Sequence, residues 1–301
     1  MQDIMGVNDI AFPNLGIYLK NIPQGFTVFG FYISLYGVII AIGMLAGITI
    51  AAHVAKRSGQ NPDDYWDFSI YGVLFGLVGA RIYYVVFQWD SYKDNLLEVF
   101  HVRNGGMAIY GGVIAAFITL FVWCGIKKKD PRLVGDTAMA GLLLGQIIGR
   151  WGNFTNREVF GEYSDGLLAM RIPIEAVRDR TDITENIASH IAEGTNYIQV
   201  HPTFLYESCL NLLLLIIVLL YYRHKKFQGE ICLMYLGGYG IIRFFVEGIR
   251  TDQLKIAGTD IAVSQMLGIV LFCVAVIADV GIRVFLIRRQ RVKSGENLSE
   301  S

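Results

Sequence analysis

The sequence predicts an all-α, polytopic membrane protein with seven transmembrane helices, the N-terminus outside, the C-terminus cytoplasmic and a small extracytoplasmic head. Of its 301 residues 53% are hydrophobic, and the mean hydropathy is +0.44. This is too apolar for an ordinary soluble domain. Seven apolar stretches approach the ~20 residues that a bilayer core requires. Because a chain in lipid must satisfy its own backbone hydrogen bonds, we expect helices in one integral membrane domain, residues 1–301.

Each of the seven stretches is justified by its length and apolar composition. They are residues 28–52, 68–89, 107–126, 133–151, 203–222, 230–249 and 261–282. The first runs for 25 residues, longer than the apolar region of a cleavable signal peptide, so we expect it to remain in the membrane. In the fourth stretch Gly141, Gly145 and Gly149 recur every four residues, a ladder that allows close helix packing.

The distribution of Lys and Arg predicts the orientation. With the N-terminus outside, the loops 53–67, 127–132, 223–229 and 283–301 face the cytoplasm and hold 14 Lys and Arg in 47 residues. The regions left on the outer side hold 9 in 106 residues. Cytoplasmic loops are enriched in these residues, and the density here is about three times higher on the inner side. We therefore expect a multi-pass protein of the cell (cytoplasmic) membrane.

The longest outer region, residues 152–202, lies between the fourth and fifth stretches. It is polar and mixed in charge, and it contains Pro173 and a run of Asp, Glu and Thr over residues 178–185. This composition predicts a small extracytoplasmic head with some helix, inserted between two spans.

Three arginines, Arg81, Arg150 and Arg243, lie within or at the ends of the apolar stretches. Each costs about 2.5–3.5 kcal/mol in the centre of a membrane helix, so a use for them is expected. The predicted topology places all three in the outer halves of their helices. Three cations at similar depth indicate one polar cavity that opens outward and binds an anion.

One face of the sixth stretch carries Tyr239, Arg243 and Glu247 at a spacing of four, with Arg250 one turn later. Two interpretations of Glu247 stay open, because an ion pair that only neutralises Arg243 explains its presence as well as a functional role does. Arg81 and Arg150 are left unexplained by such pairing.

The sequence contains no HExxH, Walker or GxSxG motif, and its five histidines do not cluster. The four cysteines lie in apolar stretches without a CxxC pair, so we expect no disulfide framework, no metal site and no cofactor. What remains is a set of cations, tyrosines, amides and carboxylates. Such groups suit a site that binds a phosphate and stabilises it as it leaves, while the nucleophile comes from a substrate.

Six motifs resemble those of one family along nearly the whole chain. The central one, GRWGNFTNREVFGE at residues 149–162, resembles the signature of the prolipoprotein diacylglyceryl transferase family. The others are LYG at 35–37 with GARIYY at 79–84, NGGMAIYGG at 104–112, HPTFLYE at 201–207 and GYGIIRFFVEGIR at 238–250.

The resemblance implies a function. Enzymes of this family move the diacylglyceryl group of phosphatidylglycerol onto the lipobox cysteine of a prolipoprotein signal peptide, which forms a thioether and releases glycerol phosphate. The expected partners are therefore phosphatidylglycerol, signal peptides and membrane lipid, with no nucleic acid. The residues that carry over as catalytic or substrate-binding are Tyr36, Arg81, Tyr110, Arg150, Asn153, Glu158, Gly161, Tyr239, Arg243, Glu247 and Arg250.

Tyr110 is a departure from the family, because many members have histidine before the Gly-Gly of this motif. A phenol with a pKa near 10 is a poor base at neutral pH. Either Tyr110 only hydrogen-bonds the head group, or the base lies elsewhere, with Glu158 and an arginine-stabilised thiolate as the alternatives.

Two other classes of membrane protein fit part of this pattern. A transporter or binding protein for anionic lipid head groups also needs buried arginines, but no internal repeat relates the two halves of the chain. An intramembrane protease needs paired carboxylates or a Ser-His pair, and Asp136 and Asp279 are candidates by type alone, without a protease motif.

Overall fold

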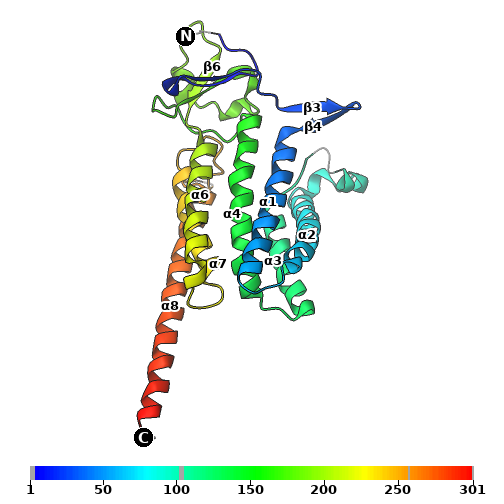
Figure 1. Cartoon of the computed structure of the whole chain (residues 1–301). Helices are drawn as coiled ribbons and strands as arrows, with labels where there is room; N and C mark the ends of the chain where they lie inside the picture. The colour runs from blue at the N-terminus through cyan, green and yellow to red at the C-terminus, as the bar shows by residue number, and fades with distance from the viewer. Residues whose placement is uncertain (1–3, 102–104, 257, 300–301) are drawn as a thin grey trace. The chain divides into compact units, whose positions relative to one another are not determined.

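The apolar stretches form long helices in the computed structural model, which describes residues 4–101, 105–256 and 258–299, and side chains up to residue 292 (Figure 1). The long helices are α1 (Leu35–Arg57), α2 (Asp63–Phe87), α3 (Ile109–Lys127), α4 (Pro131–Asn156), α6 (Thr203–Tyr221), α7 (Glu230–Glu247) and α8 (Val263–Ser299), with a short α5 (Glu185–Ser189). Each predicted span overlaps one of the seven long helices.

Five helices within the described residues are long and apolar enough to cross a membrane: α1, α2, α3, α6 with its extension to His224, and α8 over residues 263–292. This agrees with a polytopic membrane protein. Helices α4 and α7, of 26 and 18 residues, carry charged side chains along their length and are not among the five. That all seven cross the membrane stays a prediction.

The expectation of an all-helical fold is corrected by two small antiparallel sheets. One has the strand order β2-β1-β5-β6, formed by Ile17–Leu19, Ile10–Phe12, Met170–Pro173 and Tyr197–Val200. The other is a hairpin of β3 (Gly25–Val28) and β4 (Phe31–Ser34). Strands of three or four residues are too short for alternation to identify them in a sequence.

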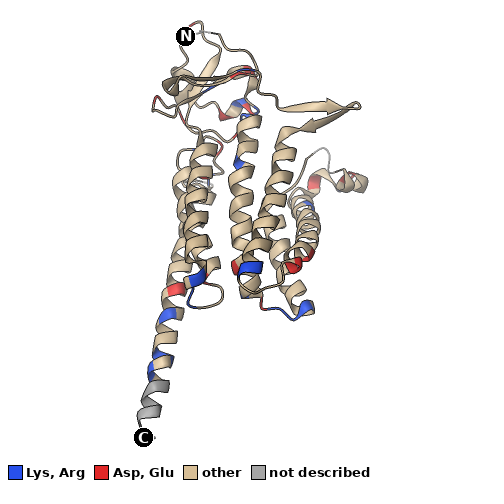
Figure 2. Ribbon diagram, in the orientation of Figure 1, with Lys and Arg blue, Asp and Glu red and all other residues tan. Residues whose placement is uncertain are grey.

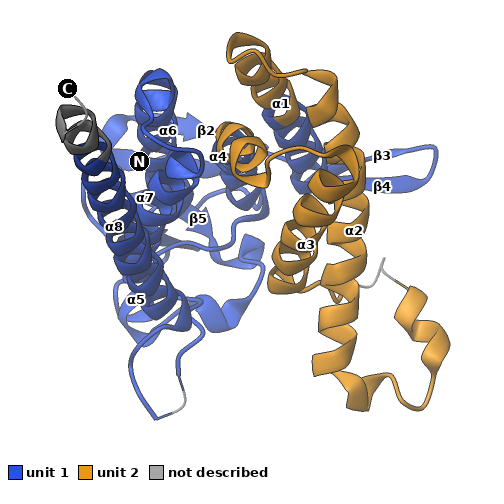
Figure 3. Ribbon diagram, turned by 90° about the horizontal axis from the view of Figure 1, so that it is seen from below, with its two compact units in different colours: residues 1–47, 142–301 blue, residues 48–141 orange. Residues whose placement is uncertain are grey.

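The chain divides into two units, residues 1–47 with 142–301 (unit 1) and residues 48–141 (unit 2), coloured in Figure 3. Unit 1 contains both sheets, α6, α7, α8, the first part of α1 and the last part of α4. Unit 2 contains α2 and α3, with a buried cluster around Tyr65, Trp123 and Val134.

The four-stranded sheet and residues 157–202 form the head of unit 1. The head is joined to two helices by one apolar core, in which Phe160, Ile172 and Val200 contact Phe154 at the end of α4 and Phe204 at the start of α6. Burying a side chain of this size contributes about 1.5–3 kcal/mol. The end of α4 and the start of α6, which carry site residues, are thus held in a fixed relation by the head.

Arg157 ties the N-terminal strands to the end of α4. Its side chain is 1% exposed and donates to the backbone oxygens of Asn8 at 2.9 Å, Ile22 at 2.6 Å and Thr155 at 2.8 Å. Burial lowers the pKa of this guanidinium, and the three carbonyls are the partners that offset its desolvation.

Close helix contacts in unit 1 depend on glycine. The predicted ladder of α4 packs on α1, where a Cβ at Gly43 would lie 3.2 Å from the Gly145 oxygen and a Cβ at Gly149 would lie 3.2 Å from Ile40. Helices α7 and α8 cross in the same way, because a Cβ at Gly240 or Gly268 would lie 2.5 Å from the other residue's carbonyl oxygen. Small residues at such crossings let the backbones approach.

Charged residues of unit 1 gather towards the ends of its helices (Figure 2). The turn that joins α6 to α7 carries Arg223, Lys225 and Lys226 and lies at the end opposite the head. There Glu230, fully buried, accepts hydrogen bonds from Tyr221 and Arg283 and so ties α7 to α6 and α8.

Gly268→Ala is expected to destabilise the protein by about 1–3 kcal/mol, because the added methyl group forces α7 and α8 apart. Gly281→Ala on the same helix is the matched control, since a Cβ there meets nothing within 4 Å. The control should gain up to about 1 kcal/mol from helix propensity. Thermal unfolding in detergent measures both, and equal melting temperatures would contradict the packing argument.

Asp9→Asn is expected to weaken the head at neutral pH. The Asp9 carboxylate accepts hydrogen bonds from the backbone of Gly6 at 3.0 Å and of Asn21 at 2.9 Å, and from the Tyr18 hydroxyl at 2.9 Å. Burial acts to raise its pKa, but these bonds outweigh burial and hold the pKa below its ordinary value. A depressed folded-state pKa gives stability that is present above the unfolded pKa of about 3.9 and lost as the pH falls further.

Hydrogen exchange of the β1 and β2 amides, corrected for intrinsic rates, measures this effect. Wild-type protection should fall below about pH 4, whereas Asp9→Asn should lose protection worth about 1–3 kcal/mol already at pH 7. The exposed Asp165, replaced by Asn, is the control. Identical profiles for wild type and Asp9→Asn would refute the assignment.

Candidate functional site

The centre of the site is a carboxylate shared by two arginines. Glu207 of α6 is 1% exposed, and its two oxygens accept from Arg150 Nη2 of α4 at 2.6 Å and from Arg243 Nη1 of α7 at 3.4 Å. The Tyr239 hydroxyl of α7 donates to the same carboxylate at 3.2 Å. Two of the three predicted arginines therefore meet, although 93 residues separate them in the chain.

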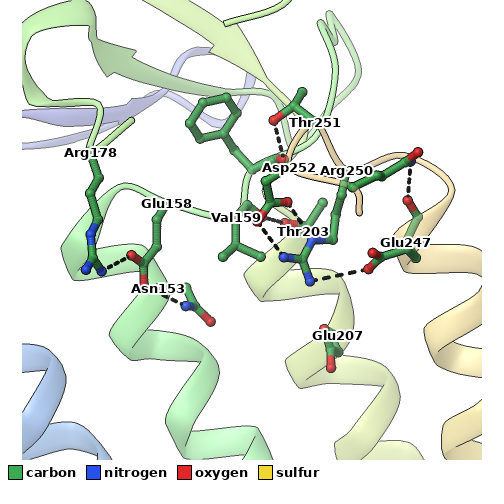
Figure 4. Close-up of polar contacts among 12 residues, drawn as sticks. Asn153, Glu158, Val159, Arg178, Thr203, Glu207, Glu247, Arg250, Thr251 and Asp252 are labelled. Carbon is green, nitrogen blue, oxygen red and sulfur yellow. Dashed lines mark hydrogen bonds and ion pairs between the residues drawn. The ribbon is translucent and has the colours of Figure 1, made fainter. Parts of the chain in front are cut away.

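The face of α7 predicted from spacing extends this cluster. Glu247 pairs with Arg243 one turn earlier at 2.7 Å and with Arg250 at 3.4 Å. Arg250 pairs in turn with Asp252 at 2.6 Å (Figure 4). Glu247 thus neutralises Arg243, as one of the two interpretations held, and it also fixes the arginine's direction relative to α6.

A second cluster adjoins the first at the end of α4. Asn153 accepts from Arg150 Nη1 at 3.2 Å and donates to Glu158 Oε1 at 2.9 Å. Glu158 also accepts from Asn156 at 3.3 Å and is paired with Arg178 of the head (Figure 4). A continuous polar network thus runs from Arg178 through Arg150 to Arg250.

The loop after α4 is strained and tightly fitted. Arg157 and Val159 have φ of 53° and 61°, a region that non-glycine residues rarely adopt and that is unfavourable for a β-branched one. The Thr203 hydroxyl of α6 donates to the Val159 carbonyl and helps to hold the loop. A Cβ at Gly161 would lie 2.7 Å from the Ile249 oxygen and 2.9 Å from His201 Cβ, so only glycine fits between them.

Tyr36 lies at the first turn of α1, and its ring packs on Gly152, where a Cβ would lie 2.8 Å away. The charges of Arg150, Glu158 and Arg178 all act on its hydroxyl. Tyr36 therefore belongs to the same neighbourhood as the second cluster.

Two predicted residues lie in unit 2, where they are described by themselves. Arg81 is buried, and its guanidinium donates to the backbone oxygens of Glu98, Val99, Gly105 and Gly106. These contacts hold the segment that leads into α3. Tyr110 stands in the first turn of α3 and is 42% exposed. Asn104, which opens this motif, lies outside the described residues, and a substrate role for Arg81 and Tyr110 stays a prediction.

Three residues of the site were missed by the sequence analysis. Glu207 could have been predicted, because a carboxylate near the start of an apolar helix needs a partner. Arg178 belonged to a mixed-charge run and gave no signal. His201 contacts the Tyr206 hydroxyl at 3.1 Å, and burial lowers the pKa of its imidazole, which favours the neutral form.

The arrangement suits the binding of a small anion. The side chains of Arg150 and Arg243 are 20% and 18% exposed, and they point at one carboxylate whose place a phosphate group can take. Among the described residues no group of three or more His, Cys, Asp and Glu side chains is arranged to hold a metal ion. The side chains that meet in the two clusters are arginines, tyrosine, amides and carboxylates.

Comparison with known proteins gives consistent matches. The family model "Prolipoprotein diacylglyceryl transferase" matches residues 23–280. Relatives named phosphatidylglycerol–prolipoprotein diacylglyceryl transferase include one from Finegoldia magna, 39% identical over 90% of this chain and 98% of its own length. Another, from Lactobacillus delbrueckii subsp. bulgaricus, is 39% identical over 90% and 92%. A third, from Clostridioides difficile, is 37% identical over 81% and 90%.

Glu207→Ala is expected to destabilise the protein by about 3 kcal/mol, because two largely buried arginines lose their shared counter-charge. Inorganic phosphate should restore more stability to this variant than to wild type, since the anion replaces the missing carboxylate. Thermal unfolding in detergent, with and without phosphate, measures both effects. Glu193→Ala, at an exposed glutamate of the head, is the control. A variant that melts like wild type and ignores phosphate would show that Glu207 does not organise the arginines.

Proposed function

The chain belongs to the prolipoprotein diacylglyceryl transferase family and is a transferase with the helices of a multi-pass membrane protein, and we propose that it transfers the diacylglyceryl group of phosphatidylglycerol to the lipobox cysteine of prolipoproteins. The names of the relatives state two substrates, phosphatidylglycerol and prolipoprotein. The transfer is the first step of lipoprotein maturation in bacteria.

The reaction breaks one bond and forms one. The cysteine sulfur attacks the glycerol carbon that bears the phosphate ester, a C–S bond forms, and the C–O bond breaks. The electron pair leaves with the oxygen of glycerol phosphate, and the thiol proton passes to a base. A thiol has a pKa near 8.5, so the enzyme must favour the thiolate as well as the leaving anion.

The convergence of Arg150 and Arg243 on one carboxylate is the observation that carries the proposal. The planar guanidinium matches the oxygens of a phosphate as well as those of a carboxylate. A phosphate that takes the place of Glu207 between the arginines is held at two points, and the charge that grows on it as the C–O bond breaks is stabilised by fixed cations.

The other residues support this centre. Tyr239, which donates to Glu207, can donate to the phosphate in its place, and Glu247 and Arg250 hold Arg243 in position. Asn153 links Arg150 to Glu158, and Gly161 allows the loop to close against His201 and Ile249. Glu158 and His201 are candidates in unit 1 for the group that takes the thiol proton. Tyr36 lies beside Glu158, where it can contact either substrate.

The site belongs on the outer side of the cell membrane. The basic turn between α6 and α7 lies at the end opposite the head, and enrichment of Lys and Arg marks the cytoplasmic side. The head and the arginines at its base are then extracytoplasmic, where a signal peptide emerges after translocation. We expect the reaction to need phosphatidylglycerol, the signal peptide and surrounding lipid, and neither a cofactor nor a nucleic acid.

Arg150→Ala and Arg243→Ala are expected to lower transfer about 100- to 1,000-fold, the loss typical of removing one preorganised donor to a developing anion. The assay uses purified protein, phosphatidylglycerol and a lipobox peptide, and mass spectrometry detects the diacylglyceryl group on the peptide cysteine. Arg180→Ala, an exposed arginine of the head, is the control and should keep wild-type activity. Wild-type protein that binds phosphatidylglycerol but never modifies the peptide would overturn the proposed function in favour of lipid binding or transport.

A further inference from the structure

A polar pocket of about 220 Å³ opens beside the second cluster of the site. Four side chains line it: Gln24 just before β3, Ser34 at the end of β4, Asn156 at the end of α4 and Arg178 of the head. All four belong to unit 1, and Arg178 and Asn156 also contact the Glu158 carboxylate. Figure 4 shows Arg178 reaching from the head towards Glu158.

The polar groups of this pocket are largely unused. Among the residues that the structure describes, the side chains of Gln24 and Ser34 form no hydrogen bond with the protein. Asn156 uses one amide N–H, at 3.3 Å to Glu158, and its amide oxygen is unpaired with any described residue. The pocket therefore offers amide and hydroxyl groups that both donate and accept, beside the N–H groups of one guanidinium.

The position of the pocket matches one part of the proposed substrate. Asn156 follows Arg150 by six residues on α4, which places it about 9 Å further along the helix towards the head. Arg150, Asn153 and Glu158 connect the two places through hydrogen bonds of 3.2 and 2.9 Å. In a phospholipid whose phosphate lies at Arg150 and whose acyl chains lie among the helices, the head group beyond the phosphate extends in this direction.

We propose that Gln24, Ser34, Asn156 and Arg178 form a subsite for the glycerol head group of the lipid donor, and for the same glycerol when it leaves as glycerol phosphate. The assignment rests on the proposed function. A diol suits these groups because each of its hydroxyls can donate one hydrogen bond and accept others. An ammonium head group suits them less well, because it donates hydrogen bonds but accepts none from Arg178 or from the side-chain amides. The subsite therefore selects polyol head groups over amine head groups.

The test compares phosphatidylglycerol with phosphatidylethanolamine as donors in mixed micelles with a lipobox peptide. Gln24→Leu and Ser34→Ala should each raise KM for phosphatidylglycerol about 3- to 10-fold, the loss expected for one neutral hydrogen bond, with kcat nearly unchanged. Arg178→Gln should raise transfer from phosphatidylethanolamine relative to phosphatidylglycerol. Thr27→Ala on the hairpin and Arg180→Gln in the head, both exposed and outside the pocket, are the matched controls.

The outcomes separate this inference from the proposed function. Wild-type protein that transfers from neither lipid would refute the function itself. Wild-type protein that prefers phosphatidylglycerol, together with pocket variants that keep its KM and its preference, would refute the subsite and leave the function standing. Variants that lower kcat/KM equally for both lipids would also refute it, because a subsite for the head group changes the preference between the two donors.

Discussion

The site depends on one shared charge interaction, the Glu207 carboxylate held between Arg150 and Arg243. Each arginine comes from a different helix, and without a common anion their guanidinium groups would repel each other in a medium that screens charge weakly. The carboxylate thus joins α4, α6 and α7 at one point. Because Glu207 is 1% exposed while each arginine keeps a partly exposed edge, the cations stay available to a ligand.

The head makes this interaction possible by fixing the helices that carry it. Its apolar core includes Phe154 of α4 and Phe204 of α6, four and three residues from Arg150 and Glu207. The strained loop at Val159 and the close packing of Gly161 against Ile249 and His201 hold Glu158 beside Asn153. Strain of about 1–3 kcal/mol at such a residue persists only where the surroundings determine its conformation, and here the buried core supplies that constraint.

Helices and strands differed in how well the sequence predicted them, for a physical reason. A span that must be apolar for about 20 residues leaves a long pattern, so the seven long helices, α5 not among them, were located from composition. The strands at residues 10–19 and 170–200 are short, and β1 pairs with β5 at Ala11 and Arg171, 160 residues apart in the chain, which no local pattern records. Arg150 and Arg243 were found because charge inside apolar sequence is unusual. Arg178 and Gln24 lie in ordinary polar sequence, and only the fold brings them to the site.

The charges of the network limit how it can bind a substrate. Arg150, Arg243 and Arg250 are balanced by Glu207, Glu247 and Asp252, and Arg178 is balanced by Glu158. A phosphodiester that enters therefore adds a negative charge to a neutral cluster. Binding of such a ligand at this place requires Glu207 to release at least one of its arginines. Under the proposed function, the lipid donor thus competes with Glu207 for the same pair of arginines, so the strength of the ion pairs at Glu207 limits how tightly the donor binds.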